Sequence, residues 1–117
     1  MNDPEPQLYV NYECSKCRSA LAILEERAVE AEHVRYLEEP PTIADLQRLM
    51  AMLAIDDPRQ MMRTGEAAYT ELGLESATPE QLLDAITTHP ILLERPIFVV
   101  GDRAVIARPP ERLLELL

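Results

Sequence analysis

The fold of this 117-residue chain is decided by a stretch near its start, residues 8–24, LYVNYECSKCRSALAIL. Residues 8–11, LYVN, are a short run typical of a β-strand that ends at a polar turn. Apolar residues between Ala20 and Ala28 then recur at helical spacing, with glutamates on the opposite side. The stretch therefore predicts a strand, a tight loop and a helix, with Cys14 at the junction.

The rest of the chain shows further strand and helix signals. A second strand is predicted over residues 33–37, and Thr42 is expected to cap a helix after the prolines at 40 and 41. Shorter helical pieces follow from residue 56 and over residues 66–72, and Pro79 starts another helix. Two strands around the turn Gly101-Asp102 and a last helix over 109–117 complete the chain.

This order, βαβ, then helices, then ββα, predicts an α/β protein with a thioredoxin-like three-layer fold, a mixed β-sheet and a helical insertion. We expect one thioredoxin-like domain over residues 1–117, since that length suits a single core. The insertion is expected at about 40–94.

Charge and hydropathy exclude several classes of function. The net charge of −10 argues against nucleic acids and anionic membrane surfaces as partners. No apolar run approaches the ~20 residues that span a bilayer. Because residues 1–7 are polar and acidic rather than a signal peptide, we expect a cytoplasmic protein whose two cysteines stay reduced.

The two cysteines form the motif Cys14-Ser15-Lys16-Cys17 at the predicted helix start. The helix terminus and the charges of Lys16 and Arg18 are expected to lower the pKa of Cys14, while Glu13 opposes them. Cys17 lies one helical turn later, where it can resolve a mixed disulfide or a sulfenic acid. The motif therefore favours redox catalysis.

Three other interpretations of the cysteines are weaker. A zinc site needs two more ligands, and His33 and His89 are isolated, so we expect no metal site. A structural disulfide across so short a loop would stabilise little. Two inert buried thiols remain an alternative.

Four further segments carry a family resemblance: YLEEPPT at 36–42, YTELGL at 69–74, HPILLERPI at 89–97 and ARP at 107–109. With the strand, cysteine and helix at the start, they resemble the glutaredoxin-linked arsenate reductase (ArsC) family, within the ArsC/Spx-like thioredoxin-fold group. The match runs in order over nearly the whole chain.

The resemblance implies a cytoplasmic oxidoreductase that reduces arsenate to arsenite. Its nucleophile maps to Cys14, and its oxyanion-binding arginines map to Arg63, Arg95 and Arg108. In this family an arsenic adduct forms on the cysteine, and glutathione then attacks the adduct. Glutaredoxin or thioredoxin completes the reduction. The resemblance implies no bound cofactor. In this fold a cis-proline faces the nucleophile, and that position maps to Pro96.

Two positions differ from the family pattern. Val10 stands where these enzymes commonly carry a histidine, and Cys17 stands where they typically have another residue. A Cys-x-x-Cys motif resembles the Spx-type regulators, so the alternative function is a redox-sensing regulator that binds RNA polymerase. A general disulfide reductase acting on proteins or glutathione adducts is the third hypothesis.

Overall fold

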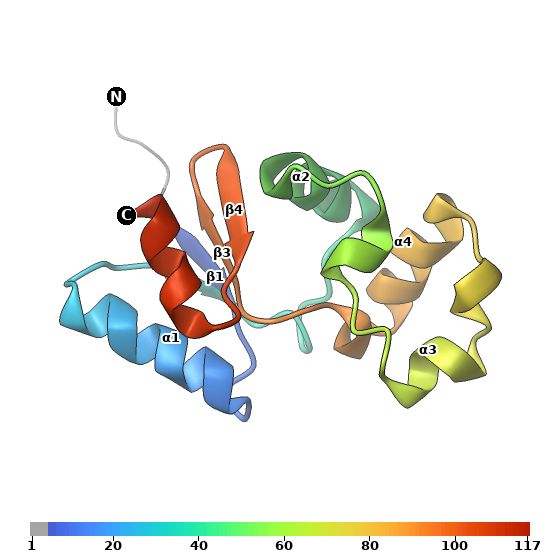
Figure 1. The fold of residues 1–117 in the computed structure, drawn as a ribbon, viewed down its shortest axis with the longest axis horizontal. Coiled ribbons are helices and arrows are strands. Elements are labelled where there is room, and N and C mark those ends of the chain that lie inside the picture. Colours follow the sequence, from blue (N-terminus) through green and yellow to red (C-terminus); the bar gives the residue numbers. More distant parts are fainter. Residues whose placement is uncertain (1–4) are drawn as a thin grey trace. The chain divides into compact units, whose positions relative to one another are not determined.

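A computed structural model describes residues 5–117 of the chain. The chain forms two compact units, one from the residues up to Tyr36 together with Arg95–Leu117, the other from Leu37–Glu94. The first unit contains the β-sheet, and the second unit is helical (Figure 1). That the second unit is an insertion at about 40–94 within a single domain stays a prediction.

The first unit is built on a four-stranded sheet with the order β2-β1-β3-β4. The strands are β1 (Gln7–Tyr9), β2 (Glu32–Val34), β3 (Ile97–Val100) and β4 (Arg103–Ile106). β1 pairs in parallel with β2, while β1–β3 and β3–β4 are antiparallel. A helix between β1 and β2 allows the parallel pairing, and Gly101, at φ +61°, makes the tight turn of the β3–β4 hairpin. The mixed α/β class predicted from the sequence is confirmed.

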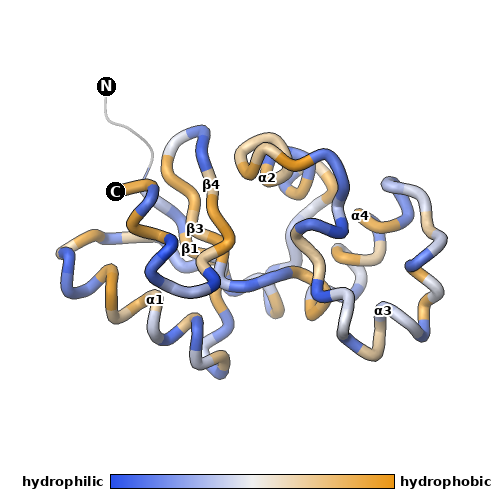
Figure 2. The backbone as a smooth tube through the Cα atoms, viewed as in Figure 1, coloured by the Kyte–Doolittle hydropathy of each residue, from blue (hydrophilic) through white to orange (hydrophobic). Residues whose placement is uncertain are grey.

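Two helices complete this unit, α1 (Ser15–Glu26) and the C-terminal 3-10 helix η4 (Pro110–Leu116). They pack against each other, and η4 also packs against β4 (Figure 1). Figure 2 shows β3 as a largely hydrophobic strand. The buried core joins strand, α1 and η4 side chains, namely Leu8, Phe98, Val105, Cys17, Ala20, Leu24 and Leu113. This apolar core anchors the start of α1 and thus the cysteine motif.

Two expected elements differ in detail. The strand expected over residues 33–37 ends at Val34, because the backbone turns there and the Tyr36 amide donates to the Val34 carbonyl at 2.9 Å. Tyr36 is nevertheless buried, at 1% exposure. The last helix is wound as a 3-10 helix, with hydrogen bonds such as Arg112 N to Pro109 O at 3.0 Å.

The second unit consists of helices. Its α-helices are α2 (Ile43–Leu53), α3 (Ala67–Glu71) and α4 (Pro79–Thr88), and its 3-10 helices are η1 (Pro58–Met61), η2 (Leu74–Ser76) and η3 (Pro90–Leu92). α2 begins with the predicted Thr42 cap: Thr42 Oγ1 accepts from the Asp45 amide at 3.0 Å, and Asp45 accepts from the Thr42 amide at 2.9 Å. α4 packs against α2, η1 and η3.

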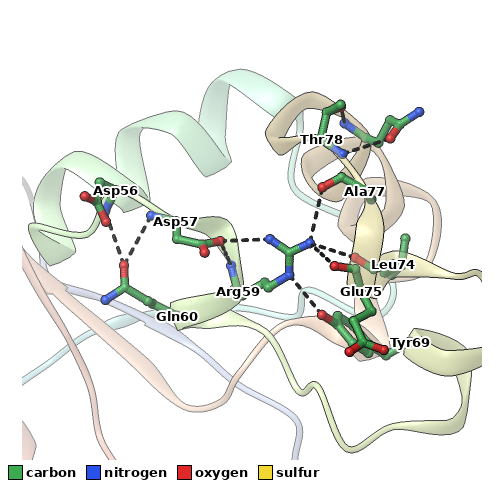
Figure 3. A network of polar contacts seen from close by, with 10 residues as sticks. Asp56, Asp57, Arg59, Gln60, Tyr69, Leu74, Glu75, Ala77 and Thr78 are labelled. Atoms are coloured by element: carbon green, nitrogen blue, oxygen red, sulfur yellow. Dashed lines mark hydrogen bonds and ion pairs between the residues drawn. The ribbon is translucent and has the colours of Figure 1, made fainter.

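Arg59 of η1 ties the parts of the second unit together (Figure 3). Its Nε donates to the Tyr69 hydroxyl at 2.9 Å, and its Nη2 donates to the carbonyls of Leu74 and Glu75 at 2.8 and 2.9 Å. The same Nη2 lies 3.2 Å from the Ala77 carbonyl. Arg59 therefore satisfies the carbonyls around η2 and holds this region against η1.

Candidate active site

Cys14 lies at the N-terminus of α1, as the N-cap residue. Its amide donates to the Asn11 carbonyl at 3.0 Å, which closes the loop after β1, and its carbonyl accepts the first helical bond from Arg18 at 3.0 Å. The side chain is half-buried. Its sulfur thus lies at the positive end of the helix.

The surroundings of Cys14 favour a thiolate. Partial burial raises the pKa of the Cys14 thiol. Hydrogen bonds lower it by more, namely those from the backbone amides of Cys17 and Lys16 and from the Cys17 thiol, and the charge of Arg95 lowers it further. The resulting pKa is about 7. A substantial share of Cys14 is therefore ionised at neutral pH, which a nucleophile requires.

Cys17 has the opposite character. It is fully buried in the core, and burial raises the pKa of its thiol to about 11, with the nearby negative charge of Cys14 adding to the shift. The Asn11 amide donates to its sulfur at 3.5 Å, which partly opposes the rise. Both thiols are free in this structure, and the interaction between the two side chains lowers the pKa of Cys14 and raises that of Cys17. The arrangement pairs a reactive thiol with a protonated one.

The charged residues near the motif act differently from what the sequence suggests. Lys16 lowers the pKa of Cys14 through its backbone amide, and the guanidinium that contributes is that of Arg95. Arg18 Nη1 instead donates to the Tyr12 carbonyl at 3.0 Å and holds the loop before Cys14. The positive charge that lowers the pKa of Cys14 therefore belongs to Arg95, which is distant in sequence.

Arg95 and Arg108 occupy adjoining segments of the first unit. Arg108 Nη1 donates to the Arg95 carbonyl at 3.1 Å, and the Ala107 amide donates to the Pro96 carbonyl at 2.9 Å. The Arg95–Pro96 bond is cis, as expected, and so is Arg108–Pro109, which the sequence did not suggest. Two of the three candidate oxyanion-binding arginines are thus brought together, and the charge of Arg95 reaches Cys14.

Arg63 belongs to the second unit. Its amide donates to the Leu92 carbonyl at 2.7 Å, and the neighbouring Met62 forms a β-bridge with Leu93. Its Nη2 lies 3.2 Å from Glu66 Oε2. Its expected place beside Cys14 stays a prediction.

Val10, at the position where a family histidine was expected, is buried at 2% exposure. An imidazole nevertheless contacts the loop before Cys14, because the Tyr12 hydroxyl lies 2.6 Å from His33 Nδ1. This contact joins β2 to the loop across 21 residues of sequence, so no local pattern predicts it.

Residues 5–117 contain neither a metal-binding cluster nor a helix that could cross a membrane. Within that part of the chain, His, Cys, Asp and Glu side chains nowhere gather in groups of three or more that suit a metal ion. None of its helices is both long enough and apolar enough to cross a bilayer.

Comparison with known sequences places the whole motif set in one family. The sequence model of the ArsC family matches residues 9–116, which include both cysteines and all three candidate arginines. This chain belongs to the ArsC family.

Relatives within the ArsC family cover almost the full chain. An arsenate reductase of Neisseria meningitidis is 42% identical over 112 residues, which are 94% of this chain and 96% of the relative. An arsenate reductase of Haemophilus influenzae is 43% identical over 112 residues, with 94% and 97% covered. The solved arsenate reductase of Vibrio cholerae is 39% identical, with a TM-score of 0.94 over 99% of this chain and 100% of that one. The thioredoxin-like ArsC fold expected from the sequence is therefore confirmed.

Proposed function

We propose that this ArsC-family protein is a thiol-dependent oxidoreductase that reduces arsenate to arsenite, with Cys14 as the nucleophile. The observation that carries the proposal is the half-buried Cys14 sulfur at the start of α1, whose pKa is about 7. The arsenate reductases among its relatives, at about 42% identity over most of the chain, support the substrate.

Arg63, Arg95 and Arg108 are proposed to bind the substrate. Arsenate is a tetrahedral oxyanion with a double negative charge near neutral pH, and a guanidinium donates paired hydrogen bonds to such oxygens. The bond from Arg108 to the Arg95 carbonyl and the effect of Arg95 on Cys14 support a shared site for these two. Arg63 is included because the ArsC family, whose model matches residues 9–116, carries its third oxyanion-binding arginine at that position.

In the first step the Cys14 thiolate attacks arsenic. A sulfur–arsenic bond forms, one arsenate oxygen leaves as water with two protons, and arsenic stays in the +V state. The arginines offset the negative charge of the adduct, which a chain of net charge −10 would otherwise repel.

In the second step another thiolate attacks the Cys14 sulfur. A disulfide forms, the sulfur–arsenic bond breaks, and its electron pair reduces arsenic to arsenite as two thiol sulfurs are oxidised. Cys17 is the proposed attacking thiol because it lies one helical turn after Cys14 and the two side chains influence each other's pKa.

Glutathione is the competing second thiol, with glutaredoxin or thioredoxin as the later reductant. The two routes differ in the role of Cys17. If Cys17 resolves the adduct, Cys17→Ser abolishes turnover with thioredoxin as the sole reductant. If glutathione resolves it, Cys17→Ser keeps turnover with glutathione and glutaredoxin.

The activity test is arsenite production by the purified protein with arsenate, glutathione and glutaredoxin, and separately with thioredoxin and its reductase. The wild type should produce arsenite with at least one donor, and Cys14→Ser should produce none. Absence of arsenite from the wild type with both donors would refute the proposal.

The proposed arginines are tested by Arg63→Ala, Arg95→Ala and Arg108→Ala. Loss of one donor to the transition state should lower kcat/KM by about 100-fold. Arg112→Ala is a matched control, because Arg112 is an exposed arginine paired with Glu115. Unchanged kcat/KM in a variant would remove that arginine from the site.

A second function, a redox-sensing regulator that binds RNA polymerase, is favoured by one observation: two adjacent free thiols of opposite acidity suit a reversible disulfide switch. Its test is co-purification with RNA polymerase before and after oxidation. Binding in one redox state only, with no arsenite production, would favour the regulator over the enzyme.

A further inference from the structure

Arg63, the candidate substrate-binding arginine of the second unit, forms an ion pair with a carboxylate of its own chain. Arg63 Nη2 lies 3.2 Å from Glu66 Oε2, and the two side chains are only 24% and 29% exposed. The pair Arg112–Glu115 has the same spacing and the same 3.2 Å separation, but its side chains are 46% and 56% exposed. The Arg63–Glu66 pair is therefore the better shielded from solvent and salt.

Helix capping does not explain the position of the Glu66 carboxylate. Glu66 is the N-cap residue of α3, yet its side chain makes no capping hydrogen bond. Its amide donates to the Arg63 carbonyl at 3.0 Å, a turn that brings the two side chains onto the same side. The carboxylate thus faces the guanidinium instead of the free amides of α3.

We propose that Glu66 is an internal counter-ion that occupies Arg63 until an oxyanion displaces it, and that it thereby sets the anion selectivity of the site. The proposal rests on the proposed role of Arg63 in binding substrate. A carboxylate presents negatively charged oxygen atoms to a guanidinium, as an oxyanion does. Because it is held in the same turn, it competes at a high effective concentration, and free monoanions such as chloride cannot replace it. A doubly charged tetrahedral oxyanion can.

The consequence is a lowered apparent affinity for every anion. Only the fraction of molecules in which Arg63 is released from Glu66 binds at full strength. Glu66→Gln keeps the size of the side chain and removes its charge, so it should lower the KM for arsenate by about threefold, a size that suits a partly exposed ion pair. The same change should make chloride a measurable inhibitor.

The experiment compares Glu66→Gln with Glu115→Gln, which removes the charge of the exposed pair. Two quantities are measured: the KM for arsenate, and protection of Cys14 from iodoacetamide by inorganic phosphate, which needs no turnover. Glu66→Gln should lower both the KM and the phosphate concentration for half-protection, while Glu115→Gln should change neither. Should Glu66→Gln fold poorly by circular dichroism, Glu66→Ser restores a side-chain cap on α3 and should give the same shift.

The outcomes separate this inference from the proposed function. An unchanged or raised KM in Glu66→Gln, with Arg63→Ala still impaired, would overturn the counter-ion role alone. Unchanged activity and protection in Arg63→Ala would instead remove Arg63 from the site, and the inference with it. A lowered KM that persists when Arg63→Ala is combined with Glu66→Gln would also overturn it, because Glu66 would then act elsewhere.

Discussion

At the residue scale, the two cysteines differ in pKa. Cys14 lies at the terminus of a helix, whereas Cys17, one helical turn later, lies in the core. Cys14 receives the amides at the start of α1 and the charge of Arg95, so its pKa is about 7. Cys17 is enclosed among Leu8, Val10 and other apolar side chains, and its pKa is about 11. The same thiol chemistry therefore gives one acidic thiol, proposed as the nucleophile, and one thiol that stays protonated at neutral pH.

The acidity of Cys14 predicts its alkylation profile. Its rate of reaction with iodoacetamide should rise with pH around a midpoint of about 7, below the value of about 8.5 for a free thiol. Arg95→Ala should move the midpoint upward, since it removes a positive charge, and Arg112→Ala should not. Mass spectrometry of the modified peptide measures the rate, and a midpoint near 8.5 in the wild type would contradict the assignment.

The same shift links stability to pH. Because folding lowers the pKa of Cys14, its thiolate stabilises the fold fully above the free-thiol pKa of about 8.5, and this contribution is lost as the pH falls through about 7. The free energy of unfolding of the wild type relative to Cys14→Ser should therefore increase between pH 7 and 9. Urea unfolding at each pH measures it, and a flat difference would show that the pKa is not shifted.

At the element scale, the ends of α2 show how local chemistry sets a helix. The capping box of Thr42 and Asp45 satisfies amides at its start, and Ala54 ends it in the left-handed region at φ +58°. A residue with a Cβ is strained there, whereas glycine is not. The residues at the start of α2 therefore suit their backbone conformation, whereas Ala54 at its end does not.

Removing the cap should weaken the helix. Thr42→Ala should lower the free energy of unfolding by about 1 kcal/mol, because the Asp45 amide loses its acceptor. Thr42→Ser keeps a hydroxyl and serves as the control. Denaturant unfolding measures both, and equal stabilities would show that the cap contributes nothing.

Relieving the strain at the other end should stabilise the protein. Ala54→Gly should raise the free energy of unfolding by about 0.5–1 kcal/mol, since glycine adopts positive φ without a steric cost. Ala51→Gly, at an exposed position inside α2, should instead lower it by about 1 kcal/mol. A loss of stability in Ala54→Gly would mean that Ala54 is not left-handed in solution.

At the scale of the whole molecule, the net charge of −10 opposes the substrate proposed for it. A doubly negative oxyanion is repelled at long range, and only the local arginines attract it. Salt screens the long-range repulsion between the protein and the oxyanion more strongly than it screens contacts inside the site. The Debye length falls from about 30 Å at 0.01 M to about 10 Å at 0.1 M, and charges farther apart than this length hardly interact.

We therefore expect kcat/KM for arsenate to increase as sodium chloride rises from about 0.01 to 0.1 M. The double variant Glu25→Gln and Glu26→Gln, on the exposed side of α1, lowers the negative charge and should show a weaker salt response. Steady-state rates at each salt concentration provide the measurement. A steady decrease over this range would show that anion competition at the site dominates instead.

Much of the fold was determined by local sequence. The strand and helix around Cys14, the Thr42 cap and the hairpin at Gly101 follow from side-chain spacing, short-range hydrogen bonds and glycine conformation, which act within a few residues. The sequence alone also predicted the family, through motifs that extend along the chain.

Only the tertiary structure decided how distant groups meet. The charge of Arg95 on Cys14, the bond from Arg108 to the Arg95 carbonyl and the contact of Tyr12 with His33 join segments that lie far apart in sequence. The pKa of Cys17 likewise depends on core packing contributed by strands, α1 and η4 together. Burial and electrostatic interaction depend on distance in space, and a linear pattern does not contain that distance.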